Sequence, residues 1–434
     1  MDTAIVFFTR DLRVHDNPAL AAACEQARMV IPAFVVDNTL TAPSPNRTRF
    51  VLGCLTDLRQ GLRELGGDLV VRQGDPVTEV LRLAGQTGAQ RIYVADDVSH
   101  YARRRRARLE RECARHRLDL VVTPGPAVVP PGDVRPQGGD HYKVFTPYWR
   151  AWSQASWRKT VAAPHAVRLP VGIRIGRIPP YGSGFSPQLA PAGEGAGRKR
   201  ARTWLRSSLA GYGDQHDDMA GDETSRLSAY LRFGCISPTL LARWSKDKPG
   251  GEEFCRQLAW RDFFYQVTAA FPDMARLDYR PRERRWHDDP QALAAWCEGR
   301  TGVPIVDAGM RQLAAEGFMH NRARMITASF LTKNLHIDWR HGYQHFFSLL
   351  LDGDVANNGG NWQWVAGTGN DTRPNRVLNP IRQARRFDPD GSYVRRYVPE
   401  LADLTEHLHT PWKLPPGLLR DLGYTAPIVD PVWS

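Results

Sequence analysis

Short apolar runs alternate with segments of helical period through the first 125 residues. The apolar runs cover residues 4–8, 30–36, 69–71, 92–95 and 118–122. Between them, segments such as 49–65 and 101–116 repeat apolar residues with the period of a helix. This alternation is typical of a parallel sheet covered by helices on both faces. We therefore predict a doubly wound α/β domain over residues 1–125.

The segment that follows the first apolar run, TRDLRVHDNPAL at residues 9–20, is rich in charged side chains. Parallel sheets bind ligands at the carboxyl ends of their strands, which makes these polar residues candidates for a ligand site: Arg10, Asp11, Arg13, His15 and Asp16. A turn in solvent explains them equally well, with Asp16 or Asn17 as the N-cap of a helix and Pro18 as its first residue. No GxGxxG motif follows this strand, so a dinucleotide-binding fingerprint is absent.

The pattern changes after the α/β domain. Residues 126–201 are rich in Pro, Gly and Arg with little periodicity, which predicts a long linker. The glycines of GEGAG at 193–197 are those of a phosphate loop, but no strand precedes them, so we assign them to the linker as well. Helical period dominates from residue 202 onwards. We predict an all-α domain over residues 202–434.

Two segments of this helical domain carry polar groups suited to a ligand. Thr224 and Ser225 open the segment 224–238, where hydroxyls can cap a helix or hold phosphate oxygens at its positive end. The segment 320–331 places three side chains on one helix face: Asn321, Arg324 and Met325. That face is too polar for a core.

The stretch DGDVANNGGNWQW at residues 352–364 has the least ordinary composition in the chain. Its carboxylates, amides and glycines argue against a helix or a strand and favour a ligand-binding segment. A tight turn with left-handed Asn and Gly and core-filling Trp is the alternative. The helical period of residues 343–351 predicts that Asp352 follows the C-terminal end of a buried helix. A carboxylate at this negative pole needs a cation or a bound hydrogen-bond donor as partner.

Length and charge narrow the class of protein. A chain of 434 residues is too long for one compact core, and its net charge of +12 favours a polyanionic partner such as nucleic acid. The arginine runs at 103–106 and 198–200 are interpreted as solvated faces without DNA contacts. Six cysteines lack disulfide or zinc spacing, and no metal site is expected. No apolar run reaches the length of a membrane span, which predicts a soluble, cytoplasmic protein.

Several motifs resemble those of the photolyase and cryptochrome family. They are FFTRDLRVHDNPAL (7–20), TSRLSAYLRFG (224–234), WRDFF (260–264), VDAGMRQL (306–313), MHNRARMITASFLTKNLHIDWRHG (319–342), DGDVANNGGNWQW and FDPDGSYVRRYVPEL (387–401). The resemblance spans nearly the whole chain and is closest to bacterial photolyases that repair cyclobutane pyrimidine dimers. It implies the photolyase fold: an α/β antenna domain, a linker and an all-α domain that binds FAD and DNA.

The resemblance assigns cofactor contacts residue by residue. It implies that FAD is bound by Tyr212, Thr224, Ser225, Arg226, Leu227, Ser228, Phe254 and Arg261, with Asn321, Arg324, Asp352, Asp354 and Asn358 around the isoalloxazine. Arg324 would supply the cation that Asp352 needs, and the pair would stabilise a reduced, anionic ring. Asn358 would face the reactive central nitrogen of the flavin. Gly359 and Gly360 would form a bend after it.

Electron transfer and substrate binding are implied in the same way. Trp362, Trp339 and Trp286 match the electron-hopping chain of the family. The flipped-out dimer would meet Gln257, Trp260, Asn321, Met325 and Trp364, and DNA phosphates would meet Arg261, Arg322 and Arg376. Gln257 stands where dimer photolyases usually carry Glu. It keeps hydrogen-bonding capacity and loses the charge, which bears on rate or lesion preference.

The implied activity is light-driven repair of cyclobutane pyrimidine dimers by electron transfer from excited, reduced FAD. The alternatives are a blue-light photoreceptor without repair and a six-four photoproduct photolyase. The antenna would be 8-hydroxy-5-deazaflavin, or alternatively methenyltetrahydrofolate, bound by Arg10, Phe34, Asp37, Arg47 and Asp97. The implied partner is UV-damaged DNA, single- or double-stranded. The protein would be a monomer in a bacterial cytoplasm, associated with the nucleoid when bound to DNA.

Overall fold

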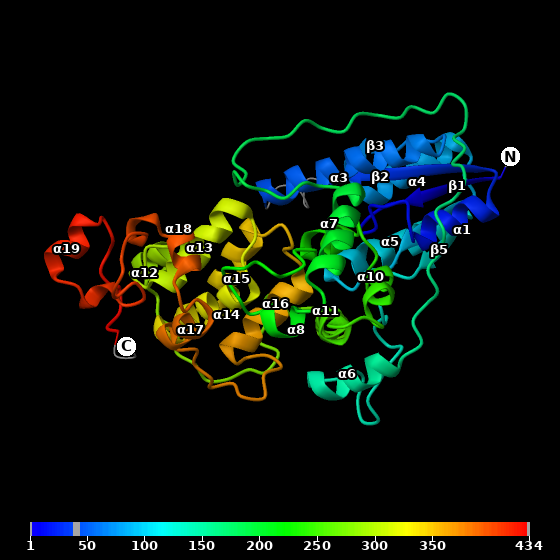
Figure 1. The fold of residues 1–434 in the computed structure, drawn as a ribbon. Coiled ribbons are helices and arrows are strands. Elements are labelled where there is room, and N and C mark those ends of the chain that lie inside the picture. The colour runs from blue at the N-terminus through cyan, green and yellow to red at the C-terminus, as the bar shows by residue number, and fades with distance from the viewer. Residues whose placement is uncertain (1, 38–43, 432–434) are drawn as a thin grey trace. The chain divides into compact units, whose positions relative to one another are not determined.

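The computed structural model describes residues 2–37 and 44–431, which form two compact units (Figure 1). Unit 1 takes the chain up to Phe185 together with Ala190–Ala210 and Ser225–Asp273. Unit 2 takes Ser186–Leu189, Gly211–Thr224 and the chain from Met274 onwards. These units describe packing, and the domain boundaries expected at residues 125 and 201 remain a prediction. Within the described ranges, no helix combines the length and apolar character needed to cross a membrane.

Unit 1 contains a parallel sheet with strand order β3-β2-β1-β4-β5. The strands are β1 (Thr3–Phe7), β2 (Met29–Val36), β3 (Val70–Gln73), β4 (Arg91–Ala95) and β5 (Asp119–Thr123). Ile5 of the central β1 pairs with Ile31 of β2 and Ile92 of β4, and all three side chains are fully buried. The strand order reverses direction at β1, which confirms the predicted doubly wound α/β fold.

The helices between these strands begin with a consistent cap. They are α1 (Pro18–Gln26), α3 (Pro45–Glu64), α4 (Pro76–Thr87) and α5 (His100–His116). Asn17, Ser44 and Asp75 accept a backbone N–H of the first turn at 3.0, 3.3 and 2.9 Å, each just before a proline. A side-chain cap followed by proline fixes where each helix starts. Asn17 is therefore the N-cap of the first helix.

The remaining helices of unit 1 are α6 (Phe145–Gln154), α7 (Glu194–Ser207), α9 (Ser228–Phe233), α10 (Pro238–Ser245) and α11 (Gly251–Ala270). The stretch GEGAG, which was assigned to the linker, contains the start of a helix, because α7 begins at Glu194. Gly193 adopts φ +102, and a Cβ there would lie 2.5 Å from the side chain of Asp57. Asp57 in turn accepts the N–H of Glu194 at 2.7 Å. The glycine thus allows a close contact that starts the helix.

Unit 2 is helical in the part of the chain that the structure describes. Its elements are α8 (Tyr212–Gln215), α12 (Pro290–Cys297), α13 (Pro304–Glu316), α14 (Asn321–Ser329), η1 (Phe330–Asn334), α15 (Trp339–Leu349), α16 (Val355–Ala366), α17 (Pro380–Phe387), α18 (Ser392–Tyr397), η2 (Pro399–Leu401), η3 (Pro411–Lys413) and α19 (Pro416–Asp421). One buried cluster, which includes Trp296, Trp339 and Trp362, joins α12 to α18. This agrees with the predicted all-α domain.

The stretch 352–364 is the largest correction to the expected secondary structure. Residues 355–366 form the regular helix α16, so neither a turn nor a bend at Gly359 and Gly360 is present. Asp354 caps the helix by accepting the N–H of Asn357 at 2.9 Å, and Gly367 ends it at φ +79. Both glycines are buried, and a Cβ on Gly359 would lie 3.1 Å from the carbonyl oxygen of Met274. The capping and this close backbone approach outweigh the low helix propensity of glycine.

Candidate functional site

An ion pair joins the two most polar segments of unit 2. Arg324 of α14 donates to both oxygens of Asp352, at 3.1 Å to Oδ1 and 2.9 Å to Oδ2. The side chains are only 25% and 10% exposed, so water screens the pair weakly. A third bond, from Nε to the carbonyl oxygen of Met319 at 2.8 Å, fixes the guanidinium. The predicted cation partner for Asp352 is confirmed as a contact.

Asp354 and Asn358 hold the first turn of α16. Asp354 is buried, and its Oδ1 accepts hydrogen bonds from the backbone N–H and the side-chain amide of Asn357, at 2.9 and 3.0 Å. Asn358 is also buried and donates one N–H of its amide to the carbonyl oxygen of Tyr343 at 3.2 Å. This bond ties α16 to α15 and sets the plane of the Asn358 amide.

Trp362 is packed in the core of unit 2 rather than in solvent. Its ring contacts Phe346 edge to face at 4.9 Å and Trp296 at 6.1 Å between centroids. A Cβ on Gly342 would lie 2.1 Å from the indole atom Cη2, so only glycine fits beneath the ring. These contacts fix the indole in one orientation.

The other two predicted electron carriers differ in exposure. Trp339 is fully buried and donates its indole N–H to Asp278 Oδ1 at 2.9 Å. Trp286 is half-buried, and the guanidinium of Arg284 lies 5.8 Å from its ring centroid. A buried middle member and a partly exposed last member suit a path that ends at the surface.

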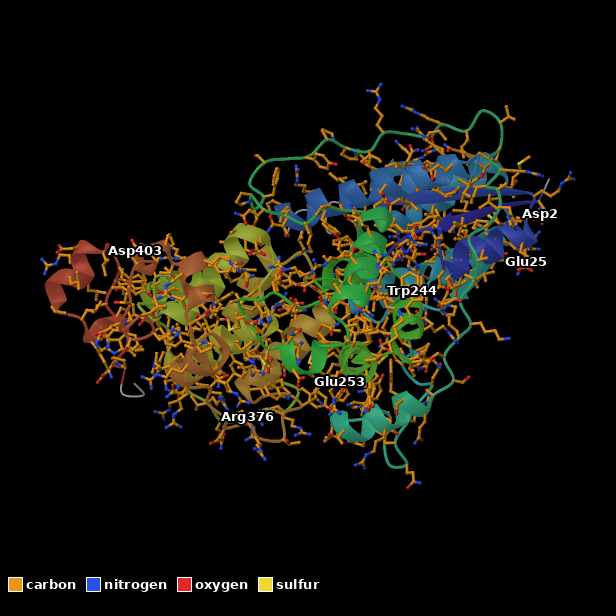
Figure 2. All side chains as sticks on the ribbon, viewed as in Figure 1. Asp2, Glu25, Trp244, Glu253, Arg376 and Asp403 are labelled. Atoms are coloured by element: carbon orange, nitrogen blue, oxygen red, sulfur yellow. The ribbon has the colours of Figure 1, made fainter. Side chains whose placement is uncertain are left out.

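The residues predicted to meet substrate in unit 2 lie on α14, α16 and the following loop. Asn321 is exposed, with its amide 3.9 Å from the sulfur of Met325. Arg322 instead pairs with Asp217, 3.2 Å from Nε to Oδ1. Arg376, labelled in Figure 2, is exposed and lies 5.2 Å from the centroid of the half-buried Trp364 ring. Of the predicted phosphate contacts in unit 2, Arg376 is thus the more accessible.

The predicted phosphate-binding residues occupy two short stretches. In unit 2, Tyr212 is buried in α8, and burial raises the pKa of its phenol, while Thr224 is half-buried. In unit 1, Ser225 accepts the N–H of Leu227 at 3.4 Å and Arg226 adopts the left-handed φ of +50. Neither Thr224 nor Ser225 caps a helix, because α9 begins only at Ser228 and its N-cap residue Leu227 has no suitable side chain.

Helix α11 of unit 1 carries four predicted residues. Phe254 is buried, Gln257 is exposed and Trp260 is half-buried one turn later. Phe145 of α6 stacks on Trp260 at 3.7 Å between centroids, which supports one face of the indole. Arg261 is 12% exposed and donates to the carbonyl oxygens of Pro126 and Leu231. These bonds hold Arg261 inside unit 1, which disfavours the predicted DNA contact.

The predicted antenna residues lie at the carboxyl edge of the sheet in unit 1. Arg10, after β1, forms a salt bridge with Asp97, after β4, at 3.3 Å. Asp37, after β2, accepts a hydrogen bond from Tyr101. Phe34 is half-buried in β2 and Arg47 is buried in α3. The strand order makes β2, β1 and β4 neighbours, so Arg10, Asp37 and Asp97 gather at one edge.

The chemistry of unit 2 fits the ring of a flavin. A flavin ring has hydrogen-bond donors and acceptors along one edge and becomes anionic when reduced. Asp352 offers acceptor atoms, and Arg324 offers positive charge and keeps N–H groups beyond the three already used. The second N–H and the carbonyl of Asn358 are neutral groups of the same kind. FAD is therefore compatible with these residues.

Three further residues support the site without having been expected from sequence. Asp278 binds the indole N–H of Trp339, Trp296 packs against Trp362, and Asp217 pairs with Arg322. Each contact joins segments 61 or more residues apart. No periodicity or motif marks such pairings. Only the folded chain brings these residues together.

Comparison with known proteins adds evidence of a different kind. A family described as "DNA photolyase" matches residues 4–167, and one described as "FAD binding domain of DNA photolyase" matches residues 254–432. A protein of Streptomyces griseus named deoxyribodipyrimidine photo-lyase is 52% identical, over 99% of this chain and 97% of that protein.

Solved structures agree with this. A bacterial class III photolyase from Agrobacterium tumefaciens has a TM-score of 0.91 and 33% identity, covering 99% of this chain and 95% of that one. A cryptochrome from Synechocystis has a TM-score of 0.93 and 28% identity, covering 99% and 97%.

Proposed function

Because this chain belongs to the DNA photolyase family, we propose that it uses light to split cyclobutane pyrimidine dimers in DNA, as a deoxyribodipyrimidine photo-lyase. The observation that carries the proposal is the similarity to a relative of that name over 99% of this chain. Two features of the chain agree with it. They are the charge pair Arg324–Asp352 and the net charge of +12, which suits a polyanionic substrate.

FAD is the cofactor in this proposal. When bound and reduced, FAD supplies light absorption and one electron, which returns after the cyclobutane ring opens. Asp352 and Arg324 would hold the polar edge of the ring, and their mutual bonds keep both side chains in place before the ring binds. Asn358 would face the ring with an amide fixed by Tyr343. Such preorganisation avoids ordering these side chains during the reaction.

The path by which an electron reaches the flavin would run through Trp286, Trp339 and Trp362. The support is chemical: indole is oxidisable, Trp362 and Trp339 are buried away from water, and Trp286 is partly exposed. The tight fit of Trp362 over Gly342 keeps its ring from rotating. A fixed ring keeps the donor distance constant.

The lesion would be held by aromatic faces and polar side chains. Trp364 and Trp260 are both half-buried, and each would offer the exposed part of its ring to a base, with Phe145 supporting one face of Trp260. Gln257 and Asn321 are exposed and offer amide groups to the bases. Stacking on an aromatic side chain contributes about 1–3 kcal/mol per base and compensates for the loss of stacking in the duplex.

The antenna, the oligomeric state and the form of DNA belong to the same proposal. A deazaflavin or folate antenna would bind at the sheet edge near Arg10 and Asp97. Their salt bridge fixes both side chains there. The chain would act as a monomer on single- or double-stranded UV-damaged DNA in a bacterial cytoplasm, at the nucleoid when bound. The net charge of +12 supports a DNA partner of either form.

A repair assay tests the function directly. One oligonucleotide carries a defined cyclobutane dimer and a defined six-four lesion, and the FAD-loaded protein is reduced before exposure to blue light. We expect reversal of the dimer in light, no reversal in the dark, and an unchanged six-four lesion. Reversal of the six-four lesion alone would move the proposal to that substrate, and reversal of neither would refute repair and favour a photoreceptor.

A matched pair of variants tests the lesion contact. Trp364→Ala should weaken binding to dimer-containing DNA roughly 5- to 150-fold, which corresponds to the loss of one base stack. Trp244→Ala is the control, since Trp244 is also half-buried but lies in α10 (labelled in Figure 2). Equal losses in both variants would argue against stacking on Trp364.

A further inference from the structure

We propose that the carboxylate of Asp278 stabilises positive charge on the indole of Trp339 and thereby helps Trp339 to act as the middle member of the electron path. The inference rests on the proposed electron path and adds a residue that lies outside it. Asp278 acts through Trp339 and is therefore a positioning residue.

The geometry around Trp339 is specific. Oδ1 of Asp278 accepts the indole N–H at 2.9 Å and also accepts Nη2 of Arg340 at 2.8 Å. Trp339 is fully buried, whereas the Asp278 side chain is 18% exposed. The indole therefore has a carboxylate as its hydrogen-bond partner in a place that water screens weakly.

The three charged groups that are hydrogen-bonded to one another beside the ring carry a net negative charge, which favours a cation on the ring. The guanidinium of Arg340 lies 4.7 Å from the Trp339 ring centroid, and this alone would oppose oxidation of the ring. Two carboxylates hold that guanidinium: Asp278, and Asp338 at 3.0 Å from Nη1. The three groups sum to one negative charge. Arg284 also interacts electrostatically with Asp278. Burial is the largest of the causes that lower the pKa of Arg284.

A second buried tryptophan, Trp296, competes with Trp339 for the positive charge. Trp296 is fully buried and lies 6.1 Å from Trp362 between centroids, so it is a competing place for the positive charge. Trp296 donates its N–H to the neutral carbonyl of Thr327 at 3.0 Å. Hydrogen bonds to charged groups are stronger than those to neutral groups. Asp278 thereby favours Trp339 over Trp296.

The electron count is simple. Once Trp362 has given one electron to the light-excited, oxidised flavin, Trp339 would give one electron to Trp362 and restore its neutral form, and no bond is broken. The positive charge then resides on Trp339, whose N–H proton stays shared with Oδ1 of Asp278. When the next electron arrives from Trp286, Trp339 returns to its starting state.

The substitution Asp278→Asn isolates the charge. Asparagine keeps an oxygen at the position of Oδ1, so both bonds it accepts can persist while the negative charge is lost. Asp338→Asn is the matched control, because Asp338 binds the same guanidinium and caps α15, while the indole N–H of Trp339 is donated to Asp278. Asparagine is an equally good N-cap. Trp339→Phe tests the path itself.

Two measurements are made on the full chain. The first is the proton shift of the Trp339 indole N–H by NMR, assigned with Trp339→Phe and readable without cofactor. The second is the yield of the long-lived tryptophan radical after a flash on FAD-loaded, oxidised protein. We expect Asp278→Asn to move the N–H signal upfield and to lower the radical yield about fivefold, as loss of a charged hydrogen bond implies. Asp338→Asn should change the yield less than about twofold.

The outcomes separate the two proposals. If Trp339→Phe leaves radical formation intact, the electron path and this inference both fail. If Trp339→Phe abolishes the radical but Asp278→Asn matches Asp338→Asn, the path stands and the role of Asp278 is refuted. An unshifted N–H signal in Asp278→Asn would show that the charge does not reach the indole.

Discussion

At the scale of single residues, Asp262 of α11 is a carboxylate held away from water. It is buried, and its Oδ2 accepts three N–H groups, from Val128 at 2.9 Å, Val129 at 3.0 Å and the Trp152 indole at 2.9 Å. Burial nevertheless outweighs these bonds and the charge of Arg261, and raises the pKa of Asp262 to about 6. The folded protein therefore binds this proton more tightly than the unfolded chain does.

This gives a prediction for the pH dependence of stability. The stabilising contribution is complete below about pH 4 and is lost as the pH rises through 6, because the folded pKa lies above the unfolded one. A difference of about two pKa units corresponds to about 3 kcal/mol. Asp262→Asn mimics the protonated form, so the free energy of unfolding of the wild type relative to this variant should fall by that amount between pH 4 and pH 7. Urea denaturation measures it.

The exposed Asp403→Asn is the control for this experiment. The free energy of unfolding of the wild type relative to Asp403→Asn should not change over the same pH range. A pH-independent difference for Asp262→Asn as well would show that Asp262 is already ionised in the folded protein at pH 4.

Sequence reasoning reached some residues and missed others for physical reasons. The need of Asp352 for a cation or a bound donor follows from its place after a helix, and the structure pairs it with the cation Arg324. Asn17 was one of two candidate caps, and proline at the next position agrees with the structure. Asp278 gave no such signal, because its partner is 61 positions away and the bond exists only in the folded chain.

At the scale of elements, the contact of α15 with α16 depends on one glycine. Gly342 lies in the middle of α15, where a Cβ would come 2.1 Å from Trp362 Cη2 and 2.6 Å from Leu331 Cδ2. Gly342→Ala should therefore displace the indole and lower the free energy of unfolding by about 1–3 kcal/mol, as overpacking does. Gly85→Ala in α4 is the same change, yet among the described residues nothing lies within 4 Å of its added Cβ.

The two variants should differ in sign. Gly85→Ala should raise the free energy of unfolding by roughly 0.5–1 kcal/mol, because alanine restricts the unfolded chain and favours a helix. Urea denaturation of FAD-free protein measures both. A neutral Gly342→Ala would mean that the two helices can move apart without loss.

Elements with a clear apolar period were easier to predict than a helix of low intrinsic propensity. The strands and helices of unit 1 follow from apolar periodicity, since burial on both faces imposes it. Helix α16 was missed because its residues have low helix propensity, while its stability comes from the Asp354 cap and from packing against Met274. Tertiary contacts override propensity in this way, and sequence periodicity cannot display them.

At the scale of the whole molecule, the fold class was predictable and the packing units were not. The alternation of apolar runs gave the doubly wound sheet, and the change of period gave the helical domain. The structure groups α9, α10 and α11 with unit 1, although their sequences belong to the helical part of the chain. Which helices pack against a sheet depends on matching surfaces, and a single sequence contains no direct record of that match.

The net charge of +12 belongs to the whole molecule and leads to the last prediction. Binding to DNA should weaken as salt increases, because each neutralised phosphate releases a counterion. The slope of log affinity against log salt should be about −0.9 per phosphate contact on duplex DNA and about −0.7 on single strands. Comparing undamaged and dimer-containing oligonucleotides should give similar slopes with a higher affinity for the lesion, because stacking on aromatic rings is less sensitive to salt.

Arg376→Gln should reduce the duplex slope by about 0.9 if this exposed arginine contacts one phosphate. Arg104→Gln is the control: it removes the same charge from an exposed position in α5, within the arginine run that was interpreted as a solvated face. Filter binding over a series of salt concentrations measures both slopes. If both variants reduce the slope equally, DNA binding depends on the overall charge of the protein rather than on a defined contact with Arg376. If neither variant reduces the slope, Arg376 lies outside the DNA interface.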